Sequence, residues 1–570
     1  MKEFKQKISL AIAEAAAALW PNAPLTAVQI GEMLEYPPDD TLGDLALPCF
    51  KLSRTLRAAP PAIAAALAEK LSGCVPAALT VAGGYLNIRI ADSYLTDRVL
   101  ANIESQDARY GASDVGAGKT VVLDYSSPNV CKPFHIGHLG TTVIGHSLKL
   151  LHEFLGYHCI GINYLGDWGT QFGKQIVAFK RWGDRETVER VGIDELVRLY
   201  VKFHEEAERD PALNDEARAE FHRLEEGDEE NMALWQWFVS VSLAEYKKMY
   251  KLLNIEFDSY KGESFYTDKM PAQVQKLRDR GLLKLDNGAS IVDLSAYNMP
   301  PCLILKTDGS TLYPTRDIAA AVYRKEAYHF DRAIYVTSAQ QTLHFAQWFK
   351  VVELMGYDWY DQLVHVPYGT VSVNGAKLAT RTGNVVLLRD LFALAIEKVE
   401  EVMAEKNPDL PNRDEVAEAV GVGAVIFYYL YNSRIKDINF SLENALSFEG
   451  STGPYAQYTY ARTCSILEKA GGKVPTGAVT LTVPEESALL VTLSKFPEKV
   501  LDAATQYEPS VVTRYIIEVC TAFNRFYQAC PILTAESEAA RTTRLRLTRA
   551  AGIVLRNALH LICLRTPEKI

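Results

Sequence analysis

The middle of the chain alternates short apolar runs with a long amphipathic stretch. Residues 120–125 form a compact apolar run, which predicts a buried strand. Beyond it, apolar residues recur at helical spacing: Leu139, Val143, Ile144, Leu148, Leu151 and Leu155. Gly156 then stands where a helix C′ glycine is expected, and residues 159–164 form the next apolar run. These elements predict a βαβ unit of a parallel sheet.

The same patterns assign the remaining regions. Apolar runs at 333–336 and 363–366 predict further parallel strands, and the charged stretch from about 180 to 260 has the spacing of a helical insertion. Residues 1–112 mix Ala-rich helical segments with a strand-like stretch at 85–90, and past Leu387 the pattern is almost wholly helical. The sequence thus predicts an α/β domain between an α+β domain and an all-α domain.

Three loop-like stretches predict linkers, at 110–118, 407–412 and 471–485. We expect domains at 1–112, 116–445 and 446–570, with the insertion at about 180–260 inside the second.

Composition narrows the class of protein. The chain has 570 residues, 48% hydrophobic and 23% charged, which excludes a disordered chain, collagen and a small disulfide scaffold. The longest uncharged apolar run, 419–431, is shorter than the roughly 20 residues that cross a bilayer. Nine cysteines form no metal-binding spacing. We therefore expect a cytoplasmic protein with reduced thiols, no membrane span and no structural metal.

The net charge of −10 does not exclude a nucleic-acid partner, because the charges are segregated. Twelve acids lie in the tract 205–230, which we interpret as a solvated pair of acidic helices. Basic residues gather instead at 51–57 and 541–549.

The strongest chemical signal is His135-Ile-Gly-His138, which joins the first strand to its helix. The start of a helix presents free N–H groups and the positive end of its dipole, which suits a phosphate. Two imidazoles add donors for a phosphoryl group, and Gly137 lets a flat ring approach the backbone. The alternative is a pair of histidines with structural hydrogen bonds only.

This element matches the HIGH signature of class I aminoacyl-tRNA synthetases. The strings DYSSPNVCKPFHIGH at 124–138 and NYLGDWGTQFG at 163–173 resemble the arginyl-tRNA synthetase family in particular. Further landmarks keep the order of that family along nearly the whole chain: GD at 43–44, GGYLN at 83–87, GES at 262–264, YPTRD at 313–317, QQ at 340–341, KLATRTGN at 377–384, GPYAQY at 453–458, AR at 461–462 and FNRFY at 523–527.

The resemblance implies an activity and a set of partners. Mg·ATP and L-arginine would give arginyl-adenylate, and the arginyl group would pass to the 3′ end of tRNA(Arg). The fold would be a Rossmann-type catalytic domain with an N-terminal tRNA-contacting domain and a helical anticodon-binding domain. The protein would be a cytoplasmic monomer, and activation would wait for tRNA.

The arginine site can be argued from chemistry as well. A guanidinium needs a planar acceptor, which a carboxylate supplies. Asp317 is the first candidate, with Tyr313 on the same helix face and Glu263 as a second acid. An ordinary surface pair is the alternative for Tyr313 and Asp317. The resemblance assigns the substrate α-amino group to Asn129 and Gln341, with Ser127 nearby.

The ATP site would include His135, Gly137 and His138, with Lys377 and Lys132 near the phosphates. Lys377 opens a KMSKS-type signature loop at 377–384, in which Thr380 replaces the second lysine. We expect Lys132 to compensate; a solvated loop lysine is the alternative.

Two residues of the signature helix also depart from the family. Gly140 stands where arginine is usual, and His146 where aspartate is common. These departures leave open a catalytically impaired paralogue that binds tRNA or regulates. A nucleotidyltransferase of the cytidylyltransferase type is a further alternative, but it does not explain the helical C-terminal third.

Aromatic residues of the C-terminal third predict an RNA contact. Tyr455, Tyr458 and Arg462 recur at spacings of three and four, and anticodon bases stack on such side chains. Core packing is the alternative for the tyrosines. The basic residues at 541–549 would meet phosphates or form a solvated face.

Overall fold

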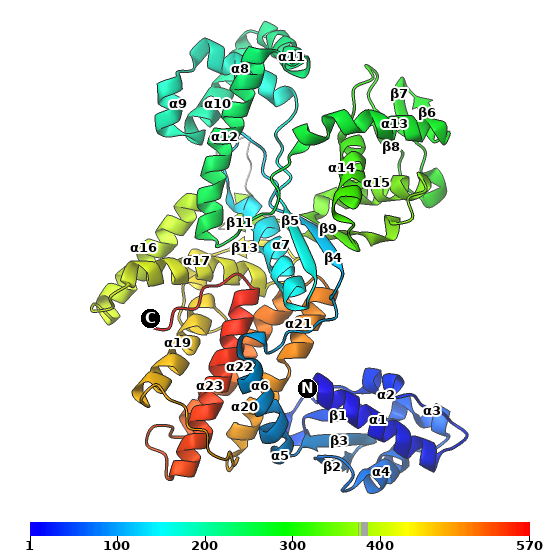
Figure 1. Ribbon diagram of the computed structural model, residues 1–570, viewed down its shortest axis with the longest axis vertical. Coiled ribbons are helices and arrows are strands. Elements are labelled where there is room, and N and C mark those ends of the chain that lie inside the picture. The colour runs from blue at the N-terminus through cyan, green and yellow to red at the C-terminus, as the bar shows by residue number, and fades with distance from the viewer. Residues whose placement is uncertain (374–375, 378–385) are drawn as a thin grey trace.

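The computed structural model describes residues 1–373, 376–377 and 386–570 (Figure 1). Its centre is a parallel sheet of four strands in the order β10-β9-β4-β5. The strands are β4 (Thr120–Asp124), β5 (His158–Ile162), β9 (Arg332–Ser338) and β10 (Leu363–Tyr368). The four predicted strands and their parallel pairing are confirmed.

The crossover helix α7 (Ile136–Phe154) joins β4 to β5, and Gly156 follows it with a φ of +86°. After β5 the chain crosses to the other side of β4 and adds β9 and then β10. The direction of winding thus reverses at β4, and in open parallel sheets ligands bind beyond the carboxyl ends of the strands at such a point.

A helical group follows β5 and lies at the top of Figure 1. It contains α8 (Thr170–Trp182), α9 (Arg185–Val191), α10 (Ile193–Arg209), α11 (Ala212–Glu225) and α12 (Glu229–Leu252). The acidic tract is therefore helical, as predicted. The long α12 returns to the sheet, where the Tyr246 hydroxyl lies 2.7 Å from the carbonyl oxygens of both Asn129 and Lys132.

A second group lies beside the sheet and carries a small antiparallel sheet of order β6-β7-β8. Its elements are α13 (Met270–Asp279), β6 (Leu283–Asp286), β7 (Ala289–Val292), β8 (Cys302–Leu305), α14 (Tyr313–Tyr328) and α15 (Thr342–Leu354).

Helices dominate the chain beyond the sheet. They are α16 (Leu388–Lys406), α17 (Arg413–Tyr431), α18 (Leu442–Ala445), α19 (Gly453–Lys469), α20 (Pro484–Ser494), α21 (Phe496–Thr505), α22 (Ser510–Ala529) and α23 (Glu538–Leu561). One strand departs from the helical prediction: β13 (Ile438–Phe440) pairs in parallel with β11 (Val371–Val373), which also pairs with β12 (Ala376–Lys377).

The N-terminal region packs helices against a three-stranded antiparallel sheet of order β1-β3-β2. Its elements are α1 (Lys2–Leu19), α2 (Ala27–Met33), β1 (Leu45–Pro48), α3 (Ser53–Leu56), α4 (Pro60–Leu71), β2 (Ala77–Ala82), β3 (Tyr85–Ile90), α5 (Asp92–Tyr94) and α6 (Ala101–Gln106). The predicted strand at 85–90 is β3. Within the described residues, no helix has the length and apolar character needed to cross a bilayer.

Contacts distant in sequence join α6 and α7 to the last helix. The Ser147 hydroxyl on α7 donates to the carbonyl of Leu561 at 2.6 Å. Arg546 on α23 pairs with Glu104 on α6 through two hydrogen bonds, one of 2.9 Å. Helix α7, which carries the histidines, and helix α6 are therefore both joined to the last helix.

Candidate active site

The loop after β4 leads into the amino end of α7, where two histidines cap the helix. The Nδ1 of His135 accepts a hydrogen bond from the Gly137 N–H at 3.1 Å. The Nδ1 of His138 accepts from the His135 N–H at 3.2 Å. Because a neutral imidazole has one donor and one acceptor nitrogen, both rings carry their proton on Nε2. Each ring of this histidine pair can donate one N–H to a ligand.

The surroundings keep the histidine pair uncharged. Burial, with the nearby charge of Lys132, lowers the pKa of His135 to about 4. Burial and the neighbouring His135 lower the pKa of His138 to about 3. The two ring centroids lie 3.9 Å apart, so two imidazolium charges would repel each other. At neutral pH the pair therefore supplies two neutral N–H donors.

The expectation of free N–H groups at this helix start is wrong for its first three residues. Ile136 donates to the carbonyl of Val386 at 3.1 Å, and His138 donates to the carbonyl of His135 at 2.8 Å. The Gly137 N–H is engaged by the His135 ring. A phosphate would thus meet the imidazole N–H groups and the helix dipole.

Gly137 is required for this arrangement. A Cβ at this position would lie 2.8 Å from the Cε1 of the His135 ring. The predicted close approach of a flat ring to the backbone is therefore present, although the ring belongs to the protein itself.

The segment that follows the signature loop lies against the histidine pair. Leu388 donates its N–H to the carbonyl of Phe134 at 3.0 Å, beside the Ile136 contact. The backbone of Lys377 belongs to β12, but its side chain and residues 378–385, including Thr380, lie outside the described residues.

The two departures on α7 fit their surroundings. A Cβ on Gly140 would lie 2.1 Å from the Tyr429 hydroxyl, so Tyr429 fills the space of a larger side chain. The Nδ1 of His146 lies 3.1 Å from the Tyr125 hydroxyl, and burial lowers the pKa of this histidine to about 3. Both positions are thus packed and uncharged.

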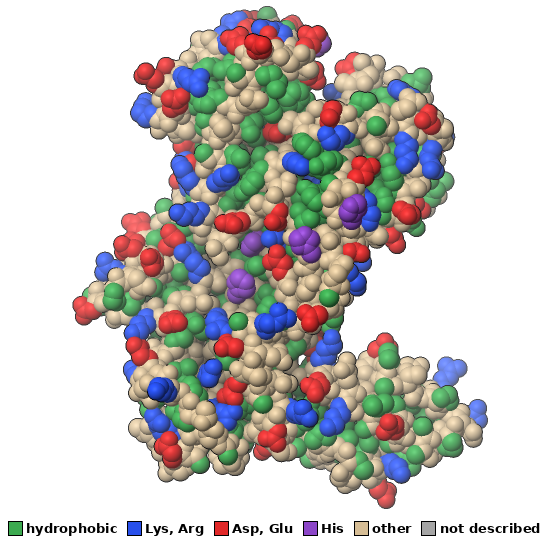
Figure 2. Space-filling model, viewed as in Figure 1, with side chains coloured by type: hydrophobic (Ala, Val, Ile, Leu, Met, Phe, Trp, Pro, Cys, Tyr) green, Lys and Arg blue, Asp and Glu red, His purple; other side chains and the backbone are tan. Residues whose placement is uncertain are grey.

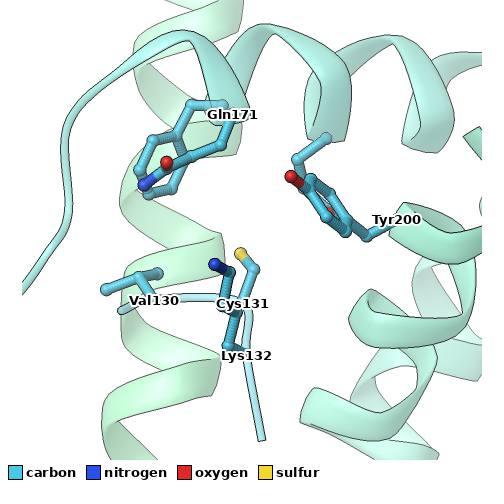
Figure 3. Close-up of a pocket in the computed structure, with 7 residues that line it drawn as sticks. Val130, Cys131, Lys132, Gln171 and Tyr200 are labelled. Atoms are coloured by element: carbon cyan, nitrogen blue, oxygen red, sulfur yellow. The ribbon is translucent and has the colours of Figure 1, made fainter. Parts of the chain in front are cut away.

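Lys132 lies beside a small cavity between the loop and the helical insertion (Figure 3). The cavity is lined by Val130, Cys131, Lys132, Gln171, Phe172, Gln175 and Tyr200. Figure 3 shows Lys132 and Cys131 pointing into it from the same side. Lys132 is exposed, yet its charge reaches both histidines. Its charge therefore acts on the histidine pair, although Lys132 itself lies outside that pair.

The predicted acids meet around Tyr164, and we call Glu263, Asp317 and Tyr164 the acidic cluster. Burial raises the pKa of the Tyr164 hydroxyl, and the charges of Asp317 and Glu263 add to the rise. Each acid already has a partner within the chain: Arg316 lies 2.7 Å from Glu263, and the His344 Nε2 lies 2.6 Å from Asp317. The acids are thus held in place before any ligand enters.

The pKa of Glu263 differs from that of an ordinary surface acid. Burial raises its pKa to about 7, in spite of the opposing charge of Arg316, and the charges of Asp317 and Asp167 add to the rise. A group that titrates near neutral pH in a cluster of this kind is typical of functional sites.

The other predicted arginine-site residues differ in exposure. The Ser127 hydroxyl accepts from the Tyr164 N–H at 3.2 Å, which links it to the acidic cluster. Asn129 is exposed and lies against Gly166, where a Cβ would come within 2.2 Å of its Oδ1. Tyr313, at the start of α14, is 67% exposed, and Gln341 is exposed just before α15. These last two lie at the open side of the site.

Several buried polar atoms near the acidic cluster have no hydrogen-bond partner among the described residues. They are Asn163 Oδ1, Tyr164 Oη, Arg316 Nε, the Nε and Nη2 of Arg324, and Tyr335 Oη. Buried polar groups are normally paired, so this concentration marks a place where a polar ligand can bind. Asn163, Tyr164 and Arg316 lie in the strings NYLGDWGTQFG and YPTRD, although no role was predicted for them individually. Arg324 and Tyr335 belong to no motif that the sequence offered.

The predicted RNA-contacting residues form a cluster on α19 and α22. Arg462 donates to the Asn524 Oδ1 at 2.7 Å, and the Asn524 amide donates to the Tyr455 hydroxyl at 2.8 Å. The Arg462 guanidinium lies 4.9 Å from the Tyr458 ring and 5.4 Å from the Tyr527 ring. Tyr458 is 41% exposed and Tyr527 43%, so two rings are open to stacking while Tyr455 is held.

The basic run at 541–549 does not form a solvated face. Arg544 is buried between Glu486 at 3.1 Å and Glu536 at 2.7 Å. Arg546 is engaged by Glu104. The expectation of free phosphate-binding charges is therefore wrong for these two arginines, which join helices to one another.

Histidine and acidic side chains gather in the middle of the face shown in Figure 2, where the central sheet lies in Figure 1. Among the described residues, no group of three or more His, Cys, Asp or Glu is arranged to hold a metal ion. The arrangement can thus bind a phosphorylated ligand at α7 and a cationic ligand at the acidic cluster.

Family models match three parts of the chain. Residues 99–442 match the catalytic domain of class I tRNA synthetases (R). Residues 2–90 match the arginyl tRNA synthetase N terminal domain, and residues 456–570 match the DALR anticodon binding domain. The fold is that of a class I tRNA synthetase.

Individual relatives narrow this class. The arginine–tRNA ligase of Alkaliphilus metalliredigens is 48% identical over 573 residues, covering 100% of both chains. That of Clostridioides difficile is 49% identical over 574 residues, again covering 100% of both. The solved Thermus thermophilus arginyl-tRNA synthetase is 26% identical, with a TM-score of 0.81 over 99% of this chain and 100% of that one. The chain belongs to the arginyl-tRNA synthetase family.

Proposed function

We propose that the chain is an arginine–tRNA ligase. It would join arginine to ATP as arginyl-adenylate, release pyrophosphate, and pass the arginyl group to the 3′ end of tRNA(Arg). The observation that carries this proposal is the placement of two neutral N–H donors at the switch point of the parallel sheet, next to the acidic cluster. The full-length relatives named as ligases favour this function over an impaired paralogue.

The proposed site has two parts. Mg·ATP is a substrate, and its phosphates would accept from the Nε2–H groups of His135 and His138, with Gly137 leaving room for the His135 ring. Lys377 and Lys132 would add positive charge as pyrophosphate leaves.

The amino acid would lie beside the nucleotide. Its guanidinium would be bound by Asp317, Glu263 and Tyr313, and its α-amino group by Asn129, Gln341 and Ser127. Since a site of polar groups rejects ligands that leave those groups unpaired, lysine and citrulline would bind poorly.

The RNA contacts belong to the flanking domains. We assign 1–112 to the tRNA-contacting domain, 116–445 to catalysis and 446–570 to the anticodon, where Tyr458 and Arg462 would stack on bases and Tyr455 would support them. We further propose a cytoplasmic monomer with no protein-bound structural metal.

Aminoacylation of total tRNA with each amino acid in turn tests this function. We expect charging with arginine alone, and arginine-dependent pyrophosphate exchange that requires tRNA. Absence of exchange both with and without tRNA would support the impaired paralogue instead.

A further inference from the structure

A buried ion pair lies beside Tyr164 of the acidic cluster. Arg324 on α14 is 1% exposed, and its Nη1 lies 2.8 Å from the Oδ2 of Asp124 at the end of β4. Its guanidinium carbon lies 5.1 Å from the Tyr164 ring and 5.6 Å from the Tyr335 ring. Buried ion pairs often add little to stability, because taking both charges out of water opposes their attraction. A role beyond packing is therefore a reasonable expectation for this pair.

The second oxygen of Asp124 fixes the proton of a serine. The Ser127 hydroxyl lies 2.9 Å from the Asp124 Oδ1 and also accepts from the Tyr164 N–H at 3.2 Å. A hydroxyl has one proton and two lone pairs. The carboxylate takes the proton in preference to the Tyr125 carbonyl at 3.3 Å, since charge-assisted hydrogen bonds are the stronger ones. One lone pair of Ser127 is left to accept a further donor.

The backbone around Ser127 is fixed as well. Ser126 and Ser127 have φ angles of +71° and +47°, two consecutive left-handed residues that are not glycine. The Ser126 N–H donates to the Thr141 hydroxyl at 3.0 Å, and its own hydroxyl lies 2.8 Å from that of Tyr250. Such strained conformations persist only where the surroundings determine them, and they concentrate at functional sites.

We propose that the Arg324–Asp124 pair positions the Ser127 hydroxyl as an acceptor for the α-ammonium group of the substrate. An ammonium has three donors and no acceptor, so a hydroxyl whose proton is held elsewhere suits it. Tyr164 spans the two ends of the site, with its N–H on Ser127 and its ring in the acidic cluster. A tyrosine measured from nitrogen to hydroxyl is about as long as an extended arginine. Arg324 and Asp124 are positioning residues, and their role rests on the proposed arginine activation.

Two arginine analogues separate the contribution of the substrate amine to binding from that of the carboxylate. Agmatine keeps the guanidinium and the amine but lacks the carboxylate, whereas 5-guanidinopentanoate keeps the carboxylate but lacks the amine. Both are tested as competitive inhibitors of tRNA-supported pyrophosphate exchange in wild type, Ser127→Ala and Asp124→Asn. We expect both variants to raise the Ki of agmatine and the KM of arginine about 10- to 100-fold. The Ki of 5-guanidinopentanoate and the KM of ATP should stay unchanged.

Asp124→Asn also leaves Arg324 buried without a counter-charge. A second variant, Arg324→Lys, therefore tests the ion pair by changing its other partner. Lysine keeps the charge but loses the planar fork, so agmatine should weaken by about tenfold. Arg544→Lys is the matched control, since Arg544 is equally buried against Glu486 but lies in the C-terminal helices. It should lower the melting temperature and leave both inhibitors unaffected.

The outcomes distinguish failure of the positioning role from failure of the proposed ligase function. Equal shifts for the two analogues, or an unchanged Ki of agmatine in the variants, would overturn the positioning role and leave the ligase function standing. Exchange that does not depend on arginine, together with inhibition by neither analogue in wild type, would overturn the proposed function and the positioning role with it.

Discussion

At the amino end of α7 the functional side chains are held by their immediate neighbours, whereas the acidic cluster is assembled from segments far apart in the chain. The histidine pair caps its own helix through contacts two and three residues away. In the acidic cluster, His344 reaches Asp317 across 27 residues, and Tyr164 and Glu263 come from other loops. The difference teaches that the orientation of the two histidine rings is set by neighbours in sequence, while the acidic cluster depends on the packing of segments distant in sequence.

The largest expected effect comes from removing Asp317. Bound arginine would bury the contact between its guanidinium and the partly exposed Asp317. Loss of one partner from such a charged contact costs about 3–5 kcal/mol, so Asp317→Ala should lower kcat/KM for arginine by at least about 100-fold. Pyrophosphate exchange measures this, and circular dichroism should show an intact fold. Asp308→Ala, on an exposed turn of the same region, is the control. Unchanged kinetics in Asp317→Ala would remove this residue from the site.

A second variant tests the histidine pair, and its expected effect on activity is of similar size to that of Asp317→Ala. An asparagine at 138 keeps an acceptor near the Nδ1 position for the His135 N–H but loses the Nε2 donor, whereas glutamine can keep a donor there. We expect His138→Asn to lower kcat about 100-fold, with the KM of arginine little changed. His138→Gln should retain more activity. If both variants lose activity equally, His138 acts through its hydrogen bond to the His135 N–H, and its Nε2–H is not needed for activity.

A smaller effect should appear in the pH profile of the acidic cluster. The pKa of Glu263 is raised to about 7, so the carboxylate gains a proton as the pH falls through 7. The cluster then loses a negative charge, and the KM of arginine should rise roughly tenfold between pH 8 and pH 6. The histidine pair titrates near 3 to 4 and contributes nothing in this window. Glu263→Gln should give a flat profile, and a profile parallel to wild type would contradict the assignment.

The smallest expected effect is on the stability of the protein, through a substitution on α7. Gly140→Ala would place a Cβ 2.1 Å from the Tyr429 hydroxyl, and overpacking of this kind costs about 1–3 kcal/mol. Calorimetry should show a lower melting temperature, partly restored by Tyr429→Phe. Gly31→Ala is the matched helical control, because its nearest neighbour is the flexible Ser9 hydroxyl at 3.3 Å. A stable Gly140→Ala would show that Tyr429 moves freely.

The sequence predicted the parts of the molecule in which the signal is contiguous. The strands of the central sheet, the crossover helix and the histidines at its start all follow from periodicity and from one short string. The acids were also predicted, but their partners Arg316 and His344 were not, because pairing depends on which helix faces lie next to each other in the fold. For the same reason the N–H of Ile136 was expected to be free, although Val386 binds it from a segment 250 residues away.

The long-range contacts of α23 have a consequence for synthesis of the protein. Glu104, just before the strand that leads to the active site, pairs with Arg546, which is 442 residues later. At about 5–20 residues per second, a ribosome needs roughly 20 to 90 s to add that length. The ion pair that joins α6 to α23 can therefore form only when translation is almost complete.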